Sequence, residues 1–425
     1  MTHDSAGSRS GRTDSPHRLV SRRRVLAASA GALTGSAALI GALKAQAEST
    51  PAGGHNPLAQ PDSTVAGPEG LATLLSYVPQ RFVQGTGGSG LHWYYADLAQ
   101  QFDALGVPRD EQGPDGENED WLPALMTLAT ASGAFQFARV PEFTDGIGFN
   151  PLGVDQTLLA GDPPNQITLF RGGLVPANLV IAWELAGYTL MVTSDGTSIW
   201  SIGTDGELDL QHPVQRAVMA AFNNVTLIGD ILVCAPTQEL LEDALAAGAG
   251  GAPSAAADPV FGASLRTLPE TTVSAIAVSP AAIGFTTDIT LSASATPEEA
   301  ARLDDLIAQS DENIAPMPPY AGLIAAVEAG AVANEEGDGA GTAMVRIVTA
   351  STEDGERATR VVEYRWNEGR SLSTGQPYVE LMEITGLSVD DGIAVIDFEQ
   401  LWSPRVWSDL IMMGDTLPFM IGTPE

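Results

Sequence analysis

Carboxylates are the residues of this sequence with the most obvious capacity for chemistry, and two short loops gather several of them. The loops contain Asp115, Glu117, Glu119 and Asp120 in one case and Glu335, Glu336 and Asp338 in the other. Such oxygen-rich loops suit Ca²⁺, which takes roughly six to eight oxygen ligands. Neither loop has the spacing of a calcium-binding hand, and a chain with 53 acidic residues produces such clusters by composition alone. We therefore predict solvated loops and no cofactor, with Ca²⁺ as the one metal that the sequence leaves open.

The histidines and the cysteine of the sequence do not form a pattern typical of a metal site or a nucleophilic site. Beyond residue 47 the histidines are His55, His92 and His212, which are widely spaced and have no Cys/His cluster around them. A zinc, copper or haem site is therefore not predicted. Cys234 is the one cysteine, so no intramolecular disulfide can form, and its apolar neighbours predict a buried thiol rather than a nucleophile.

A glycine-rich run at 85–90 has the letters of a dinucleotide-binding fingerprint, which requires a strand before it and a helix after it. Here a strand-like aromatic run follows instead, so a flexible turn is predicted. There is no Gly-x-Ser-x-Gly elbow, and a pair of Ser89 and His92 would require the loop to fold back. No catalytic residue is predicted. The aromatic run Trp93, Tyr94 and Tyr95 could line a ligand-binding face, but strand alternation sends its members to opposite sides, which favours ordinary sheet packing.

The first 47 residues have the order of segments expected of an export signal. A basic, Ser-rich lead is followed by the motif residues Ser21, Arg22, Arg23, Val25 and Leu26, and Ala45 and Ala47 precede the expected cleavage site. The apolar stretch at 27–43 lies between them. Paired arginines are read by a receptor, the apolar run inserts, and small residues fit the signal peptidase. The alternative is a retained membrane anchor, because the run is close to the lower limit of about 17 residues for a span.

This segment resembles the twin-arginine signal family, and the resemblance covers residues 1–47 only. It implies that the twin-arginine translocase carries the folded chain out of the cytoplasm, so that the protein works in the cell envelope or the medium, or anchored to the membrane if the signal is uncleaved. No cysteine lies near the cleavage site, so a lipid-anchored form is not supported. The remainder resembles, in outline only, uncharacterised exported bacterial proteins, and no motif carries a function across.

The charge of the exported portion limits its partners. Removal of the signal takes seven of the 20 basic residues and two of the 53 acidic residues, which leaves 13 arginines against 51 carboxylates, a net charge of −38. Such a field repels polyanions, so nucleic acid and anionic membranes are not expected partners. An acid-rich, lysine-free surface also suits strong salt, where the Debye length falls to about 3 Å at 1 M. A habitat of high ionic strength is therefore a hypothesis.

The organisation beyond the signal is predicted from composition and spacing. Residues 48–66 are a Pro- and Gly-rich flexible leader, a first α+β unit covers 67–250, and a second covers 259–425. The Ala-, Gly-, Ser- and Pro-rich segment at 246–258 marks a boundary or a long loop. The similar order of elements in both units indicates a duplicated α+β unit with antiparallel sheets, hairpins and packed helices.

Individual elements follow from turn and periodicity signals. Hairpins are predicted about Asp195-Gly196, Gly229-Asp230, Glu353-Asp354-Gly355 and Asp390-Asp391-Gly392. The hairpin about 353–355 would join strands at 344–349 and 358–366. Helices are predicted to begin at Pro68, Leu98, Pro176, after Thr237 and after Thr296, with further helices near Leu323 and at 402–413.

Two classes of function remain open on these grounds. The preferred one is a non-enzymatic exported protein, a binding or structural module of the envelope or medium, because no constellation of catalytic residues is visible. The alternative is an exported enzyme, either a hydrolase that uses carboxylates or a cofactor-loaded oxidoreductase. The separation of paired carboxylates in space, on which glycoside cleavage depends, cannot be obtained from the sequence.

Overall fold

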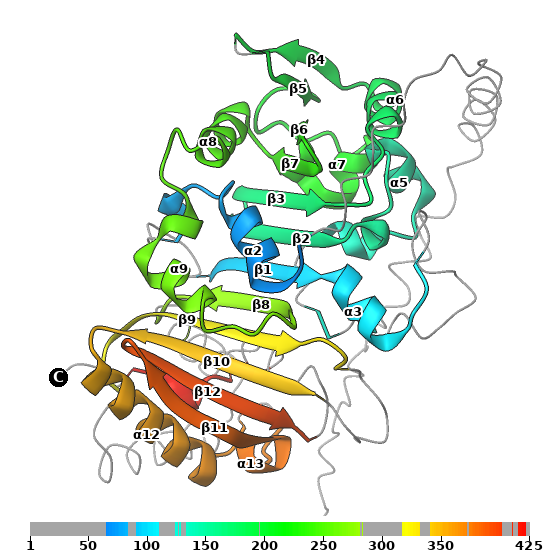
Figure 1. Ribbon diagram of the computed structural model, residues 1–425. Helices are drawn as coiled ribbons and strands as arrows, with labels where there is room; N and C mark the ends of the chain where they lie inside the picture. Colours follow the sequence, from blue (N-terminus) through cyan, green and yellow to red (C-terminus); the bar gives the residue numbers. More distant parts are fainter. Residues whose placement is uncertain are drawn as a thin grey trace, which may run out of the picture. The chain divides into compact units, whose positions relative to one another are not determined.

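A computed structural model describes residues 65–83, 91–109, 124–125, 127–128, 133–194, 196–280, 283, 317–331, 341–371, 374–401, 410 and 415–421. All of them belong to one unit, Ser63–Glu425. It is built on a 12-stranded antiparallel sheet with helices packed on both faces (Figure 1). The predicted α+β class is therefore confirmed.

The sheet has the strand order β11-β12-β10-β9-β8-β1-β2-β3-β7-β6-β5-β4, and neighbouring strands are antiparallel throughout. In chain order the strands are β1 (Leu91–Asp97), β2 (Gln156–Asp162), β3 (Asn165–Arg171), β4 (Thr189–Val192), β5 (Ser198–Ser201), β6 (Asn224–Ile228), β7 (Ile231–Ala235), β8 (Thr272–Val278), β9 (Tyr320–Glu328), β10 (Thr342–Thr349), β11 (Met382–Asp390) and β12 (Ile393–Gln400). Most of the central strands are apolar and β-branched because they are covered on both faces.

The helices vary from four to 17 residues. They are α2 (Gly67–Leu75), α3 (Leu98–Leu105), α5 (Pro141–Ile147), α6 (Pro176–Ala186), α7 (Pro213–Val218), α8 (Gln238–Gly248), α9 (Pro259–Leu265), α12 (Thr352–Glu368) and α13 (Tyr378–Leu381). Short 3-10 helices are η2 (Gln80–Phe82), η3 (Gly133–Phe137), η4 (Pro151–Gly153), η5 (Met219–Phe222), η6 (Ala255–Ala257) and η7 (Leu417–Phe419). As predicted, Thr237 caps α8, its Oγ1 accepting a hydrogen bond from the Leu240 N–H at 3.2 Å.

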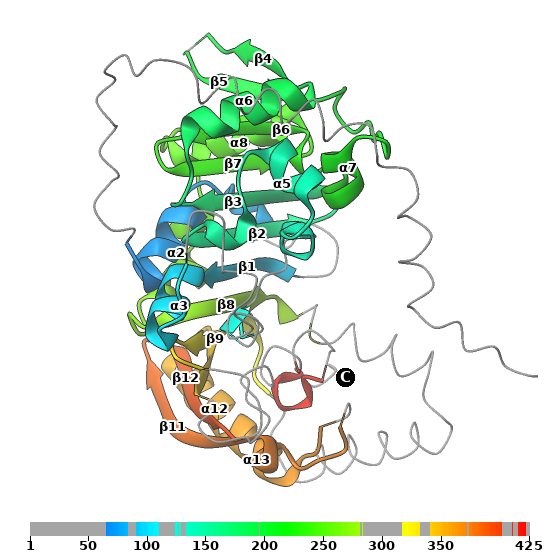
Figure 2. The ribbon, with the colours of Figure 1, turned by 90° about the vertical axis from the view of Figure 1, so that its right-hand side faces the viewer.

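The helices divide between two faces of the sheet. α2, α8 and α9 pack on one face, which we call face A, and share a core with Trp93 and Tyr95 of β1. The opposite face, face B, is covered by α3, α5, α6 and α7 over the first half of the chain and by α12 and α13 over the second. Figure 2 shows α5 and α6 on the viewer's side of the strands of the first half. Tyr94 belongs to the face B core, so the predicted alternation of the aromatic run is confirmed, and all three rings are buried.

The two halves of the chain contribute strands in the same order. In the first half β1, β2, β3, β7 and β6 are successive neighbours, and in the second half β8, β9, β10, β12 and β11 are. β1 and β8 meet at the junction, where Tyr94 lies opposite Ile276. β5 and β4 extend the first half beyond β6. This repetition agrees with the predicted pair of similar halves, and both halves belong to one continuous sheet.

The strand predicted at 358–366 is wrong, because this region is part of helix α12. The helix begins after Ser351, whose Oγ accepts a hydrogen bond from the Asp354 N–H at 3.1 Å. Glu353, Asp354 and Gly355, which suggested a hairpin turn, lie within the start of the helix, and acidic side chains in a first helical turn are favoured by the helix dipole. A run typical of a turn is also typical of a helix start.

The helix predicted near Leu323 is also wrong, because these residues form β9. This strand lies between β8 and β10, and residues 322–327 are all buried. A strand covered on both faces loses the alternation of polar and apolar residues, and such a short apolar run cannot be distinguished from a buried helix by spacing.

The hairpin predicted about Asp390-Asp391-Gly392 is confirmed, since Asp390 pairs with Ile393 across the turn. Asp391 and Gly392 both have positive φ, 46° and 82°. Two such residues form the mirror-image turn that matches the twist of a hairpin, and glycine adopts it without a steric penalty. The hairpins joining β4 to β5 and β6 to β7 are confirmed as well.

Several predicted features lie outside the described residues and stay predictions. They are the signal with Ser21, Arg22, Arg23, Val25, Leu26, Ala45 and Ala47, the leader at 48–66 up to residue 64, the glycine-rich run at 85–90, the acidic loops with Asp115, Glu117, Glu119, Asp120, Glu335, Glu336 and Asp338, the helix at 296–307, and the helix at 402–413 apart from residue 410.

Candidate functional site

A buried carboxylate, Asp97, is the centre of a polar network at the end of β1. Its Oδ2 accepts hydrogen bonds from the side-chain amide of Gln156 at 2.7 Å and from the backbone N–H of Gly67 at 3.3 Å. The Tyr95 hydroxyl lies 3.2 Å from the same oxygen. Asp97 Oδ1 accepts from the Gln100 N–H at 2.9 Å and so caps α3. The carboxylate therefore joins α2, β1, β2 and α3.

The network is enclosed, which fits a structural role. Asp97 is 1% exposed, and both its oxygens are occupied by protein donors. Burial raises the pKa of Asp97 above its usual value, although the hydrogen bonds it accepts act in the opposite direction. Burial, with Asp97 next to it, raises the pKa of the Tyr95 hydroxyl well above its ordinary value. A carboxylate with a shifted pKa can mark an active site. Asp97 has no access to solvent, so its role is better explained as holding the neighbouring elements together.

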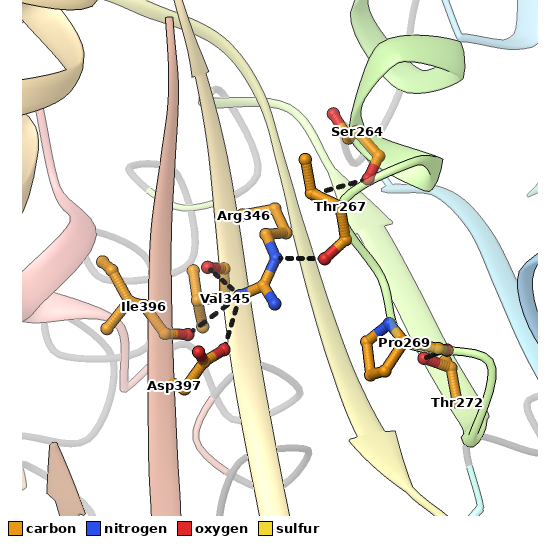
Figure 3. A network of polar contacts seen from close by, with 8 residues as sticks. All are labelled: Ser264, Thr267, Pro269, Thr272, Val345, Arg346, Ile396 and Asp397. Atoms are coloured by element: carbon orange, nitrogen blue, oxygen red, sulfur yellow. Dashed lines mark hydrogen bonds and ion pairs between the residues drawn. The ribbon is translucent and has the colours of Figure 1, made fainter. Parts of the chain in front are cut away.

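Arg346 is a second buried polar centre, on face A of β10 (Figure 3). Its Nη1 donates to Asp397 Oδ1 at 2.9 Å and to the carbonyl oxygen of Ile396 at 3.1 Å, and its Nε donates to the carbonyl oxygen of Thr267 at 3.2 Å. The Arg346 side chain is 4% exposed. Burial lowers the pKa of Arg346, and Asp397 opposes that shift. The guanidinium of Arg346 on β10 therefore links this strand to the segment after α9, through Thr267, and to β12, through Ile396 and Asp397.

A third network lies beneath α12. Asp415 accepts hydrogen bonds from Ser371 Oγ at 2.6 Å and from the Tyr378 hydroxyl at 2.7 Å. All three residues are buried, and the Tyr378 ring stacks on Trp366 with centroids 4.9 Å apart. Burial raises the pKa of Tyr378, and Asp415 adds to that shift. The arrangement joins the end of the described chain to α13.

The single residues considered in the sequence have ordinary surroundings where they are described. Cys234 is buried in β7, and burial raises the pKa of its thiol well above the usual value, as expected of a structural cysteine. His212 precedes α7, and its Nε2 lies 2.8 Å from the carbonyl oxygen of Ala186. Among the described residues no three His, Cys, Asp or Glu side chains are grouped so that they could hold a metal ion. No helix in the described part of the chain has the length and apolarity needed to cross a membrane.

An exposed apolar surface, in contrast, has no explanation within the fold. Its members are apolar side chains of α6, of the residue before it and of β4: Val175, Val180, Ile181, Leu185, Leu190 and Val192. We call this set the α6–β4 surface. The exposed fractions run from 37% for Val180 to 60% for Val192. Isolated exposed apolar residues are normal, but a set gathered on two successive elements indicates a contact surface.

The register of β4 and β5 places both parts of this surface on face B. Leu190 is opposite Trp200, whose ring lies 5.9 Å from that of Trp183 on α6. Met191 is opposite Ile199, which belongs to the face A core. Directly opposed side chains point to the same face of a sheet. Leu190 and Val192 therefore point to face B beside α6, which covers the neighbouring strand β5.

β4 is also the last strand of the sheet that the structure describes, and among the described strands none pairs with its outer edge (Figure 1). Its sequence, Thr189 to Val192, has no charged residue. The opposite edge is β11, which carries Glu383 and Asp390. Charged side chains on an edge strand hinder its pairing with another chain. The two edges thus differ, and β4 is the one open to pairing.

The sequence of α6 contains apolar residues beyond those that face the core. Leu179, Trp183 and Ala186 are at the spacing of one helical face, and the structure buries Leu179 and Trp183 and partly buries Ala186. Val180, Ile181 and Leu185 lie outside that helical face, so the helix is apolar nearly all round. A helix of this kind is expected in a fully enclosed position. Where the fold encloses one side of it only, the other side is available to a partner.

The comparisons with known proteins do not identify a function. No protein-family model matches the chain, and no curated protein matches it. A solved structure, crystal form I of TP0453, is similar, with a TM-score of 0.33 and 9% identity over 79% of this chain and 97% of that chain. A similarity of this degree carries no argument about function.

Proposed function

We propose that this chain is an exported, acidic protein of the cell envelope or medium that acts by binding rather than by catalysis, and that the α6–β4 surface is its binding surface. The observation that supports this function is the exposure of apolar side chains on both α6 and β4. Keeping them in water is costly, since burying such a side chain contributes about 1.5–3 kcal/mol. A partner that covers them would recover this free energy.

Export is the first part of the proposal that can be tested. We expect that replacing the pair Arg22 and Arg23 with lysine leaves the precursor in the cytoplasm, because the translocase receptor reads the paired guanidinium groups. The measurement is an immunoblot of cytoplasmic, envelope and medium fractions from the native host. Arg18→Lys, in the basic lead outside the motif, is the matched control and should be exported normally. Normal export of the doubly substituted chain would contradict the proposal.

Binding can be tested by amide hydrogen exchange in the dilute protein purified from its host. We expect the amides of β4 to exchange quickly in the protein alone and several-fold more slowly after addition of the host's envelope fraction, because a bound partner covers the edge. The amides of β11 are the internal control and should not change. Exchange at β4 that changes neither with the envelope fraction nor with the protein's own concentration, or a stoichiometric cofactor in the native mass spectrum, would contradict a binding function.

A further inference from the structure

We propose that the occupant of the α6–β4 surface is a second copy of this chain, paired so that β4 lies antiparallel to β4 of the copy. The inference rests on the proposed binding function and adds the identity of the partner. It would make the sheet continuous across two chains. Three properties of this end of the molecule favour it.

The first property is the free backbone edge. Within the described part of the chain β4 pairs with β5 alone, with Thr189 to Val192 opposite Ser201 to Ser198. The outer N–H and C=O groups of such a strand are a template for another strand. A lipid surface could cover the apolar side chains but could not satisfy these groups, which is why open sheet edges are not found facing hydrocarbon. The partner is therefore expected to supply a strand.

The second property is symmetry. Two identical strands that pair antiparallel in one sheet are related by a twofold axis perpendicular to the sheet, and every contact is then made twice. This axis keeps both copies of α6 on face B. Each α6 would lie over β5 of its own chain. The two β5 strands would be roughly 14 Å apart, since the strand order β5-β4-β4-β5 contains three strand spacings. Leu190 and Val192 of both chains would lie on the sheet surface between the two helices, where the copy covers them.

The third property is charge. A chain with a net charge of −33, and more after export, repels its own copy, and this repulsion is weakest for contacts through a surface without carboxylates. β4 has no charged residue, and Glu184 is the one acidic residue of α6. A pairing through β11 would bring Glu383 and Asp390 of two chains together. Self-association should therefore use β4 and should strengthen with salt, which screens the remaining repulsion.

The test is the molar mass of the purified protein by sedimentation equilibrium, over a wide range of concentration and at low and about 1 M salt. We expect a reversible dimer whose dissociation constant falls as salt is added. Leu190→Lys and Leu190→Glu should each raise that constant at least tenfold. The lysine variant makes the chain less negative, so weaker association in it cannot be attributed to added repulsion. Ser388→Lys, at an exposed position of the opposite edge β11, is the matched control and should leave the dimer intact.

Circular dichroism of each variant establishes that it is folded, and hydrogen exchange of the wild type should show β4 protected at high concentration. A monomer at every concentration and salt would overturn the second-copy proposal, as would a dimer broken by Ser388→Lys but not by Leu190→Lys. Binding of a monomer to phosphatidylcholine vesicles would overturn it in favour of lipid. If the monomer's β4 amides are still protected by the envelope fraction, the proposed binding function survives while this inference fails. If the β4 amides of the monomer are not protected by the envelope fraction, both the proposed binding function and the second-copy proposal fail.

Discussion

Replacing Trp366 with alanine is expected to destabilise the folded protein by about 4 kcal/mol, because large aromatic-to-alanine changes in a core cost roughly 3–5 kcal/mol. Trp366 is fully buried between α12 and the sheet. Its ring lies 4.6 Å from that of Phe398 and 4.9 Å from that of Tyr378, centroid to centroid. Its Nε1 donates to the carbonyl oxygen of Met382 at 2.9 Å, so the substitution also leaves that acceptor unpaired.

The measurement is urea unfolding of the purified protein followed by far-ultraviolet circular dichroism. Tyr364→Ala is the matched control, because Tyr364 is on the same helix but 40% exposed, and we expect it to cost less than about 1 kcal/mol. Equal effects of the two changes would mean that α12 does not pack on the sheet through its Trp366 side. This would contradict the described core of the second half of the chain.

The same helix illustrates why part of the fold could not be predicted from the sequence. Glu353, Asp354 and Gly355 suit a hairpin turn, and they equally suit the start of a helix capped by Ser351. Local chemistry does not decide between the two, because the deciding contacts are with strands distant in the sequence. The same Asp-Gly dipeptide does form a hairpin turn at Asp391 and Gly392, both with positive φ, where β11 and β12 pair on either side of it.

β9 and β2 show a different limit. The run around Leu323 is buried on both faces, so its periodicity is lost and a helix is equally compatible with the spacing. Polar residues at the ends of β2, such as Gln156, are buried by partners from β1 and α2, which no local pattern reveals. Helices with one apolar stripe, such as α8, were predicted correctly because burial on one side leaves a period.

The candidate site was missed for a related reason. Carboxylates, histidines and glycines are the residue types that suggest catalysis or ligand binding in a sequence, whereas the α6–β4 surface is made of apolar side chains. Ile181, Leu185 and Val192 are ordinary core residues in a sequence. Only the sheet order shows that β4 has no outer neighbour among the described strands, and only the β4–β5 register shows that Leu190 and Val192 point to the side of α6. An exposed apolar surface can be recognised only when the tertiary structure shows which side chains the other elements bury.

The second large effect is expected at Asp97, where replacement with alanine should cost about 3 kcal/mol. Loss of the α3 cap accounts for about 1 kcal/mol. The buried donors of Gly67 and Gln156 lose their acceptor, and a buried donor left unpaired costs roughly 1–3 kcal/mol. Gly67 cannot adjust easily, because its φ is 61° and it packs closely against the backbone of Glu270. Asp103→Ala, at an exposed aspartate of α3, is the matched control and should stay within about 0.5 kcal/mol of the wild type.

The pH dependence of this difference tests the electrostatics of the site. Burial raises the pKa of Asp97 in the folded state above the unfolded value of about 3.9. Between these two pKa values the folded state binds more protons than the unfolded state, so the free energy of unfolding contributed by Asp97 increases as the pH falls. Compared with Asp97→Ala, the wild type should therefore gain stability on acidification through the raised pKa, down to about pH 4. Urea unfolding of both proteins over this range measures the difference. A difference that shrinks as the pH falls would mean that the hydrogen bonds from Gln100, Gln156 and Gly67 outweigh desolvation and hold the carboxylate ionised.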